Sequence, residues 1–172
     1  MLYARIRILL IFVFLVTGTI LHFKGTAGAW YLYLAGVILL VTQVIFGNVW
    51  SAFSLLKKGK VQAAEKLVNF TKFPRLLLPQ HRAYYHFCKG LIALQHKDFA
   101  NGKTNLKSAL DLGLRTDNDN AMAALNLAHL FYVQKDFPNA RKHLKQAKRF
   151  PTNDLLLKEN IEKLTQILNK PS

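Results

Sequence analysis

The sequence predicts an all-α protein in which a transmembrane hairpin of two helices precedes a short array of paired helices closed by a C-terminal capping helix. The first observation is a segregation of charge: residues 1–50 contain three of the 24 basic residues, Arg5, Arg7 and Lys24, and none of the nine acidic ones. The second is an internal similarity within residues 51–172 at a fixed offset. Because an apolar segment and a highly charged one require different surroundings, we expect two domains, a membrane anchor over residues 1–50 and a helical domain over residues 51–172.

The first predicted span is short. Sixteen uncharged residues, 8–23, separate Arg7 from Lys24. As a helix this run rises about 24 Å, whereas the hydrocarbon core of a bilayer is about 30 Å thick. It can span only if the flanking basic side chains extend towards the two interfaces.

The second predicted span has a clearer frame. The run between Lys24 and Lys57 carries no charge, with Trp30 near its start and Trp50 near its end, as in an aromatic belt at both water boundaries. We expect one continuous helix from Trp30 to Lys58. The alternative is a break near Gly47 or Ser51, followed by a linker.

Basic residues set the expected topology. Arg5 and Arg7 flank the hairpin on the same side as Lys57, Lys58 and Lys60, which predicts a two-span protein with both termini in the cytoplasm. In the alternative, the first run is a signal peptide cleaved near the small residues 27–29, Ala-Gly-Ala.

Residues 80–152 contain a tandem pattern with a constant offset, equal to the separation of Lys97 from Lys135. The matching positions are Gly90 with Ala128, residues 97–99 with 135–137 (both Lys-Asp-Phe), Gly102 with Ala140, Leu106 with Leu144, and Ala109 with Ala147. Such self-similarity indicates stacked helix pairs, each with small residues where its helices cross. A weaker third copy includes Ala52, Gly59, Lys60, Val61, Ala64 and Val68.

This order of small residue, turn, aromatic residue and alanines resembles the tetratricopeptide repeat, and the resemblance implies a short TPR-like α-solenoid. The repeat of this chain is longer than the usual period of the family, which is about 34 residues. We place the additional residues in a loop at 116–120. The early aromatic residue of the family pattern is missing in both clear copies. A final helix capped by Asn153 and ending at Asn169 is expected to cover the last pair.

In tetratricopeptide arrays the first helices of the pairs line a groove that binds peptides. The resemblance therefore implies a protein-binding adaptor, with a partner that we expect to be a component of a membrane complex. The candidate partner-binding residues on the first helices, 81–96 and 120–135, are Tyr84, Phe87, Leu91, Met122, Asn126, His129 and Tyr132.

Basic residues close to the predicted span are candidates for contacts with anionic lipid headgroups. They are Lys57, Lys58, Lys60, Arg75 and Arg82. An alternative function for so basic a chain, with a net charge of +15, is to recruit RNA or ribosomes to the bilayer. Nucleic acid is the less favoured partner because the sequence has no nucleic-acid-binding motif.

The sequence offers no argument for catalysis. It has no Gly-rich phosphate loop and no nucleophile elbow, so we expect neither an enzyme nor a cofactor. His81 and His86 are five residues apart, which places them on different faces of a helix, and no metal site is expected. The single cysteine, Cys88, excludes a disulfide framework and is expected to be a core residue.

Overall fold

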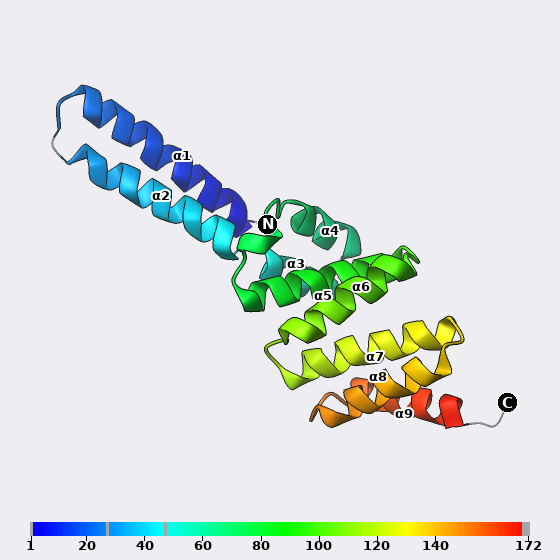
Figure 1. Cartoon of the computed structure of the whole chain (residues 1–172). Coiled ribbons are helices and arrows are strands. Elements are labelled where there is room, and N and C mark those ends of the chain that lie inside the picture. Colours follow the sequence, from blue (N-terminus) through cyan, green and yellow to red (C-terminus); the bar gives the residue numbers. More distant parts are fainter. Residues whose placement is uncertain (1, 27, 47, 170–172) are drawn as a thin grey trace.

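The computed structural model describes residues 2–26, 28–46 and 48–169, together with their side chains except those of residues 2–5, 7, 8 and 43–46. Within these ranges the chain forms nine α-helices and one short 3-10 helix, and no strand (Figure 1). The prediction of an all-α protein is therefore confirmed.

The first two helices form an antiparallel hairpin that projects away from the other helices (Figure 1). They are α1 (Leu2–Phe23) and α2 (Ala29–Phe46). Gly18 and Gly36 are buried where the two helices meet, and a Cβ atom on Gly36 would lie 3.2 Å from Leu15 Cδ2. Large apolar side chains elsewhere on the hairpin are exposed, with Phe12 at 68% and Phe23 at 86%.

The predicted membrane topology is wrong. No helix in the described part of the chain is both long enough and sufficiently apolar to cross a bilayer, so the structure does not support a two-span membrane protein with both termini in the cytoplasm. The uncharged run in α1 is short, and α2 ends at Phe46 after 18 residues. The continuous helix predicted from Trp30 to Lys58 is also wrong, because the chain turns at Asn48 (φ −105°, ψ 20°) before α3 begins. Ala27 and Gly47, named in the two alternatives, lie outside the described residues, and Ser51, the other residue named for a break, lies within α3.

Three antiparallel helix pairs and a final helix follow the hairpin. The 3-10 helix η1 (Pro74–Leu76) joins the first pair to the second. The helices are α3 (Val49–Lys57) with α4 (Val61–Asn69), α5 (Pro79–Gln95) with α6 (Phe99–Leu112), α7 (Asp117–Val133) with α8 (Phe137–Arg149), and α9 (Leu155–Asn169).

The turn inside each pair has the same backbone conformation. Gly59, Lys97 and Lys135, which are evenly spaced in the sequence, have positive φ angles of 70°, 59° and 61°. The next residue caps the second helix in two of the pairs: Asp98 Oδ1 accepts from Asn101 N at 3.1 Å, and Asp136 Oδ1 accepts from Asn139 N at 3.2 Å. The left-handed residue reverses the chain, and the caps satisfy N–H groups that the helix leaves unpaired.

Small residues allow the helices of a pair to approach closely. A Cβ atom on Gly90 of α5 would lie 2.7 Å from Leu106 Cγ, and one on Gly102 of α6 would lie 2.8 Å from Leu94 Cδ2. The equivalent positions in the other two pairs are fully buried alanines, namely Ala52, Ala64, Ala128 and Ala140. The core runs along these crossings, with one cluster between α3 and α7 and another between α7 and α9.

Two predicted boundaries need correction. Of the residues placed in a lengthened loop, 117–120 instead form the first turn of α7, and Thr116 caps this helix because its Oγ1 accepts from Asp119 N at 3.1 Å. The cap of α9 is Asp154, whose Oδ1 accepts from Leu157 N at 3.2 Å, rather than Asn153. At α9 the capping side chain thus lies one residue after the predicted position.

Glycine substitutions test the left-handed turns. We expect Lys97→Gly and Lys135→Gly each to raise the free energy of unfolding by about 0.5–1 kcal/mol, because a left-handed conformation is costly for every residue with a Cβ atom. The same change at Lys145, which is exposed in the interior of α8, should lower it by about 1 kcal/mol. Urea denaturation measures all three, and equal effects at Lys97 and Lys145 would contradict the turn assignment.

Candidate protein-binding groove

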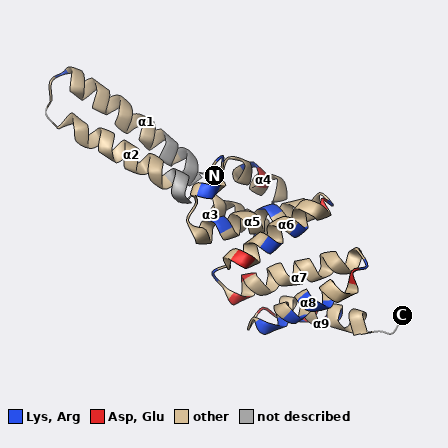
Figure 2. Ribbon diagram, viewed as in Figure 1, with Lys and Arg blue, Asp and Glu red and all other residues tan. Residues whose placement is uncertain are grey.

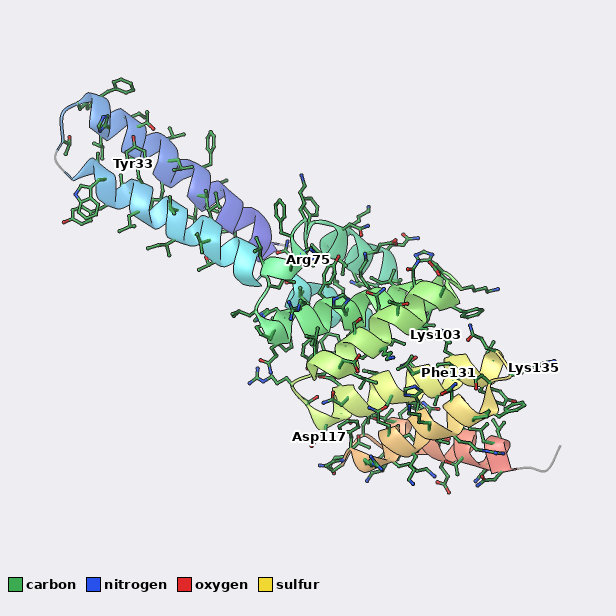
Figure 3. All side chains as sticks on the ribbon, viewed as in Figure 1. Tyr33, Arg75, Lys103, Asp117, Phe131 and Lys135 are labelled. Carbon is green, nitrogen blue, oxygen red and sulfur yellow. The ribbon has the colours of Figure 1, made fainter. Side chains whose placement is uncertain are left out.

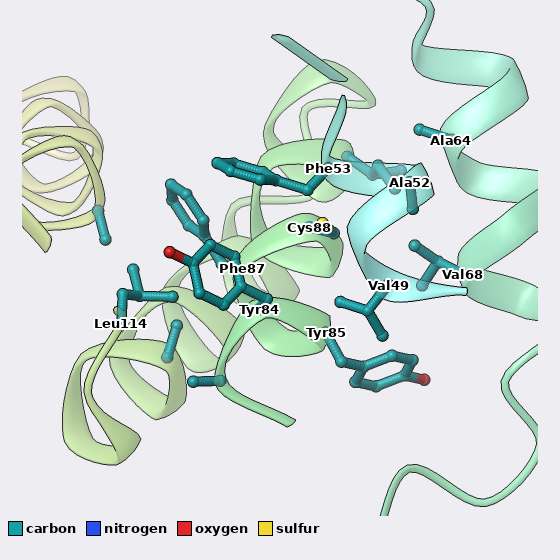
Figure 4. Packing of buried hydrophobic residues seen from close by; sticks show 14 of the residues in the cluster. Val49, Ala52, Phe53, Ala64, Val68, Tyr84, Tyr85, Phe87, Cys88 and Leu114 are labelled. Carbon is teal, nitrogen blue, oxygen red and sulfur yellow. The ribbon is translucent and has the colours of Figure 1, made fainter. Parts of the chain in front are cut away.

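Two of the predicted groove aromatics lie in the core. Tyr84 and Phe87 of α5 have no exposed surface, so the prediction that they are exposed on a groove is wrong (Figure 4). The rings of Trp50 and Phe53 on α3 cover Tyr84, with centroids 4.5 and 5.0 Å away, and Phe53 also packs 5.7 Å from Phe87. Helix α3 thus occupies the face of α5 that sequence reasoning left open.

A buried polar junction joins the first helices of all three pairs. Tyr84 Oη of α5 donates to Asp119 Oδ2 of α7 at 2.5 Å, and Lys57 Nζ of α3 lies 3.7 Å from Asp119 Oδ1. Asp119 is only 4% exposed. Burial, and then the hydrogen bond and charge of Asp119, raise the pKa of Tyr84 well above its usual range. The hydroxyl therefore stays a donor at neutral pH.

The edge of this junction carries a second aromatic contact. Trp50 Nε1 donates to His81 Nε2 at 3.0 Å, and the two rings meet edge to face with centroids 6.0 Å apart. Burial lowers the pKa of His81, which favours the neutral ring that this hydrogen bond requires. Helices α3 and α5 are thus held together by polar as well as apolar contacts.

An open groove of about 430 Å³ lies between α7 and α9. From α7 it is lined by Asn118, Met122, Leu125, Asn126 and His129. From the α9 side it is lined by Asp154, Leu156, Leu157, Asn160, Lys163, Leu164 and Ile167. Leu156 is 68% and Ile167 45% exposed, so the groove presents apolar surface to solvent between polar rims.

Local hydrogen bonds hold the α7 wall in place. Asn126 Nδ2 donates to Met122 O at 2.8 Å, which leaves the amide oxygen of Asn126 available to accept. At one end of the groove Thr152 Oγ1 donates to Asn118 Oδ1 and ties the α8–α9 loop to α7. The groove is therefore preformed on packed helices.

The predicted partner-binding residues are divided by the fold. Met122, Asn126 and His129 line the groove, whereas Tyr84, Phe87, Leu91 and Tyr132 do not. Leu91 is half-buried against the core of the first two pairs. Tyr132 is half-buried beyond the end of the groove, 6.4 Å from the ring of His129.

Sequence reasoning missed the α9 wall because it assigned the apolar residues of this helix to covering the last pair. Helix α9 carries two adjacent stripes. Leu157, Ile161, Leu164 and Leu168 form the buried stripe. Leu156, Asn160, Lys163 and Ile167 form a second stripe with the same helical spacing, and this one faces the groove. The polar residues Asn160 and Lys163 between Leu156 and Ile167 were the only sign in the sequence that this stripe is not wholly buried.

The basic residues predicted to contact headgroups are spread over three elements. Lys58 and Lys60 are exposed at the α3–α4 turn, Arg75 is exposed in η1, and Arg82 is half-buried near the start of α5. Lys57 is engaged by Asp119 and lies 4.4 Å from the centroid of the Phe53 ring. These residues were predicted to contact lipid headgroups because they lie close to a predicted membrane span. The structure does not support that span.

Titratable groups are dispersed in the described part of the chain. No group of three His, Cys, Asp or Glu side chains within it comes together as a possible metal site. Cys88 is fully buried in α5, and burial, with a smaller contribution from the charge of Asp119, raises the pKa of its thiol to about 12. A thiol in this state is a poor nucleophile at neutral pH.

Comparisons with protein-family models, curated proteins and solved structures give no match to this chain.

Removal of the Tyr84 hydroxyl tests the buried junction. We expect Tyr84→Phe to lower the free energy of unfolding by about 1–3 kcal/mol, because it leaves the buried Asp119 carboxylate without its donor. The matched control is Tyr85→Phe. Tyr85 is also buried, but the structure shows no hydrogen bond from its hydroxyl within the described residues, and we expect a change below about 0.5 kcal/mol. Equal losses in urea denaturation would mean that the hydroxyl bond contributes no stability.

The Cys88 thiol should make stability fall at alkaline pH. Its pKa is near 9.0 when exposed and about 12 in the fold, so the unfolded chain loses this proton first. The stabilisation is complete below about pH 9 and is lost as pH rises towards 12, with a slope of up to about 1.4 kcal/mol per pH unit. Cys88→Ala should flatten the wild-type profile of unfolding free energy from about pH 9 upward. Parallel profiles would contradict this.

Proposed function

We propose that the chain is a non-catalytic adaptor built from tetratricopeptide-like helix pairs, and that it binds a segment of a partner protein in the groove between α7 and α9. The observation that supports this most directly is the preformed groove with exposed Leu156 and Ile167 between polar rims. Exposed apolar side chains in a concave site are the usual basis for binding an apolar partner surface.

The regular positions of the three pairs support the repeat interpretation. The left-handed turn recurs at Gly59, Lys97 and Lys135, and the small crossing residues recur at the same constant offset. Recurrence of both a backbone conformation and a packing position favours tandem units over an unrelated set of helices. The pairs stack in sequence order (Figure 1), as in arrays that use their inner helices for binding.

The spacing along the two walls favours an amphipathic helix as the bound segment. Asn118, Met122, Leu125 and His129 recur at intervals of four, three and four residues along α7, and Leu156, Asn160, Lys163 and Ile167 do so along α9. Each wall is about 16 Å long, which corresponds to about three helical turns. A partner helix with apolar residues on one face can place them between the two walls and its polar face towards solvent.

Neighbouring leucines provide a test of the groove. Peptides would first be selected from a displayed random library on the immobilised protein. The affinity of each selected peptide would then be measured in solution for the wild type, Leu156→Ala and Leu155→Ala. We expect Leu156→Ala to weaken binding about 10- to 100-fold, because it removes a central apolar contact. Leu155 is 80% exposed and does not line the groove, so Leu155→Ala should have an effect below about 2-fold.

Two outcomes would contradict the proposal. One is an equal effect of the two leucine substitutions, which would place the peptides elsewhere on the chain. The other is an affinity that falls steeply with salt, because binding by apolar contacts is little screened whereas binding by surface charge is strongly screened. Circular dichroism of both variants serves as the control for folding.

A further inference from the structure

A second cleft lies between α6 and α8, on a side of α7 different from the groove. Its volume is about 520 Å³, and α7 contributes Leu127 and Phe131 to it. Three lysines are at its rim, Lys103 and Lys107 from α6 and Lys142 from α8. The remaining lining residues are polar: Thr104, Ser108, Asp111, Asp136, Asn139 and His143.

The floor of this cleft is an aromatic pair. The rings of Phe131 and His143 stack with centroids 5.3 Å apart and an interplanar angle of 2°. Lys103 Nζ lies 5.5 Å from the centroid of Phe131, and Figure 3 shows these two residues where α6 faces α7. The floor is therefore flat and packed, and the positive charge lies above it.

Helix α8 contributes positive charge without acidic residues of its own, as Figure 2 shows. Its basic residues are Arg141, Lys142, Lys145, Lys148 and Arg149. Within the described residues, the ion pairs are Lys57–Asp119, His96–Glu65 and Lys163–Glu159. None of these includes Lys107 or Lys142, whereas Asp136 of the same cleft has a pKa that is lowered by its hydrogen bonds from Asn139 and, to a smaller extent, by the charge of Lys103.

Lys107 of α6 and Lys142 of α8 line the same cleft as His143, from two different helices. Burial lowers the pKa of His143, and the charges of Lys142 and Lys107 lower it further. Two cations brought together on a packed surface repel each other, and an anion placed between them relieves this repulsion. The arrangement is thus complementary to a carboxylate or another compact anion.

We propose that the α6–α8 cleft binds an acidic segment of a second partner protein, with a carboxylate held between Lys107 and Lys142. This goes beyond the proposed function of the groove, because it gives the adaptor a second binding surface that is basic rather than apolar. The groove takes apolar side chains, and the cleft takes acidic ones.

The neutral groups of the cleft favour a polypeptide over nucleic acid. Thr104 Oγ1 donates to Ala100 O at 3.0 Å, Ser108 Oγ donates to Thr104 O at 3.0 Å, and Asn139 Nδ2 donates to Asp136 Oδ2 at 2.7 Å. The hydroxyl oxygens of Thr104 and Ser108 therefore remain acceptors, and Asn139 offers its amide oxygen together with a second N–H donor. A peptide backbone supplies an N–H donor at almost every residue to match these oxygens, whereas the phosphate groups of a nucleic acid supply none.

The test uses an octapeptide of alternating glutamate and glycine, blocked at both ends, titrated into the isotopically labelled full chain and followed by NMR. We expect shifts of the Lys107, Lys142 and His143 signals, and none from the same peptide with glutamine in place of glutamate. The double substitution of Lys107→Gln with Lys142→Gln should weaken binding at least about 10-fold. The matched control, Lys66→Gln with Lys72→Gln, removes the same charge at positions on and after α4, away from the cleft, and should change binding by less than about 2-fold.

Three results would overturn this proposal. Equal weakening by the two double substitutions would show attraction to net charge only. Equal binding of the glutamine peptide would remove the role of the carboxylates. Tighter binding of a single-stranded RNA octamer through Lys107 and Lys142 would assign the cleft to nucleic acid. The glutamine-peptide comparison uses wild-type protein, so it stands even if a lysine variant does not fold. None of the three results depends on the α7–α9 groove.

Discussion

The close approach of the helices within each pair is the constraint on which the other packing depends. Leu106 is fully buried against Gly90, and a Cβ atom on Gly90 would overlap it, because that atom would lie 2.7 Å from Leu106 Cγ. Side chains at such crossings cannot be enlarged without moving the second helix outward, because protein interiors are packed at nearly crystalline density. The position of each second helix fixes that of the next pair, so the groove and the cleft both inherit their shapes from these contacts.

Local signals were sufficient to predict the helix pairs. The residues at a constant offset combine a turn with small crossing positions, and both features depend mainly on neighbours in sequence. The failures involve contacts between distant residues. Tyr84 and Phe87 have the spacing of groove residues, but Trp50 and Phe53 cover them, and periodicity does not reveal which other helix covers a face. Likewise, hydropathy did not reveal the interruption at Asn48.

The groove was only half predicted, for a related reason. Met122, Asn126 and His129 were identified from their positions on the first helix of the last pair, and the structure places them on one wall. The opposite wall belongs to α9, where the apolar stripe that packs inward and the stripe that faces the groove differ by one residue in register. Spacing identifies a helix but does not show which of two adjacent stripes is buried. Only the packing of Leu157 against the α7–α8 pair decides that Leu156 faces outward.

The junction at Asp119 has a consequence for cooperativity. In a linear array each unit contacts its neighbours, and stability is close to a sum of unit and interface terms, so ends can fray independently. Here Lys57 and Asp119, which are far apart in sequence, join the first helix of the first pair to that of the third. Opening of α3 would expose the ring of Tyr84 and deprive the buried carboxylate of its cation in one step. The N-terminal pair is thereby coupled to the third pair, and we expect the helices from α3 to α9 to unfold together rather than as three independent pairs.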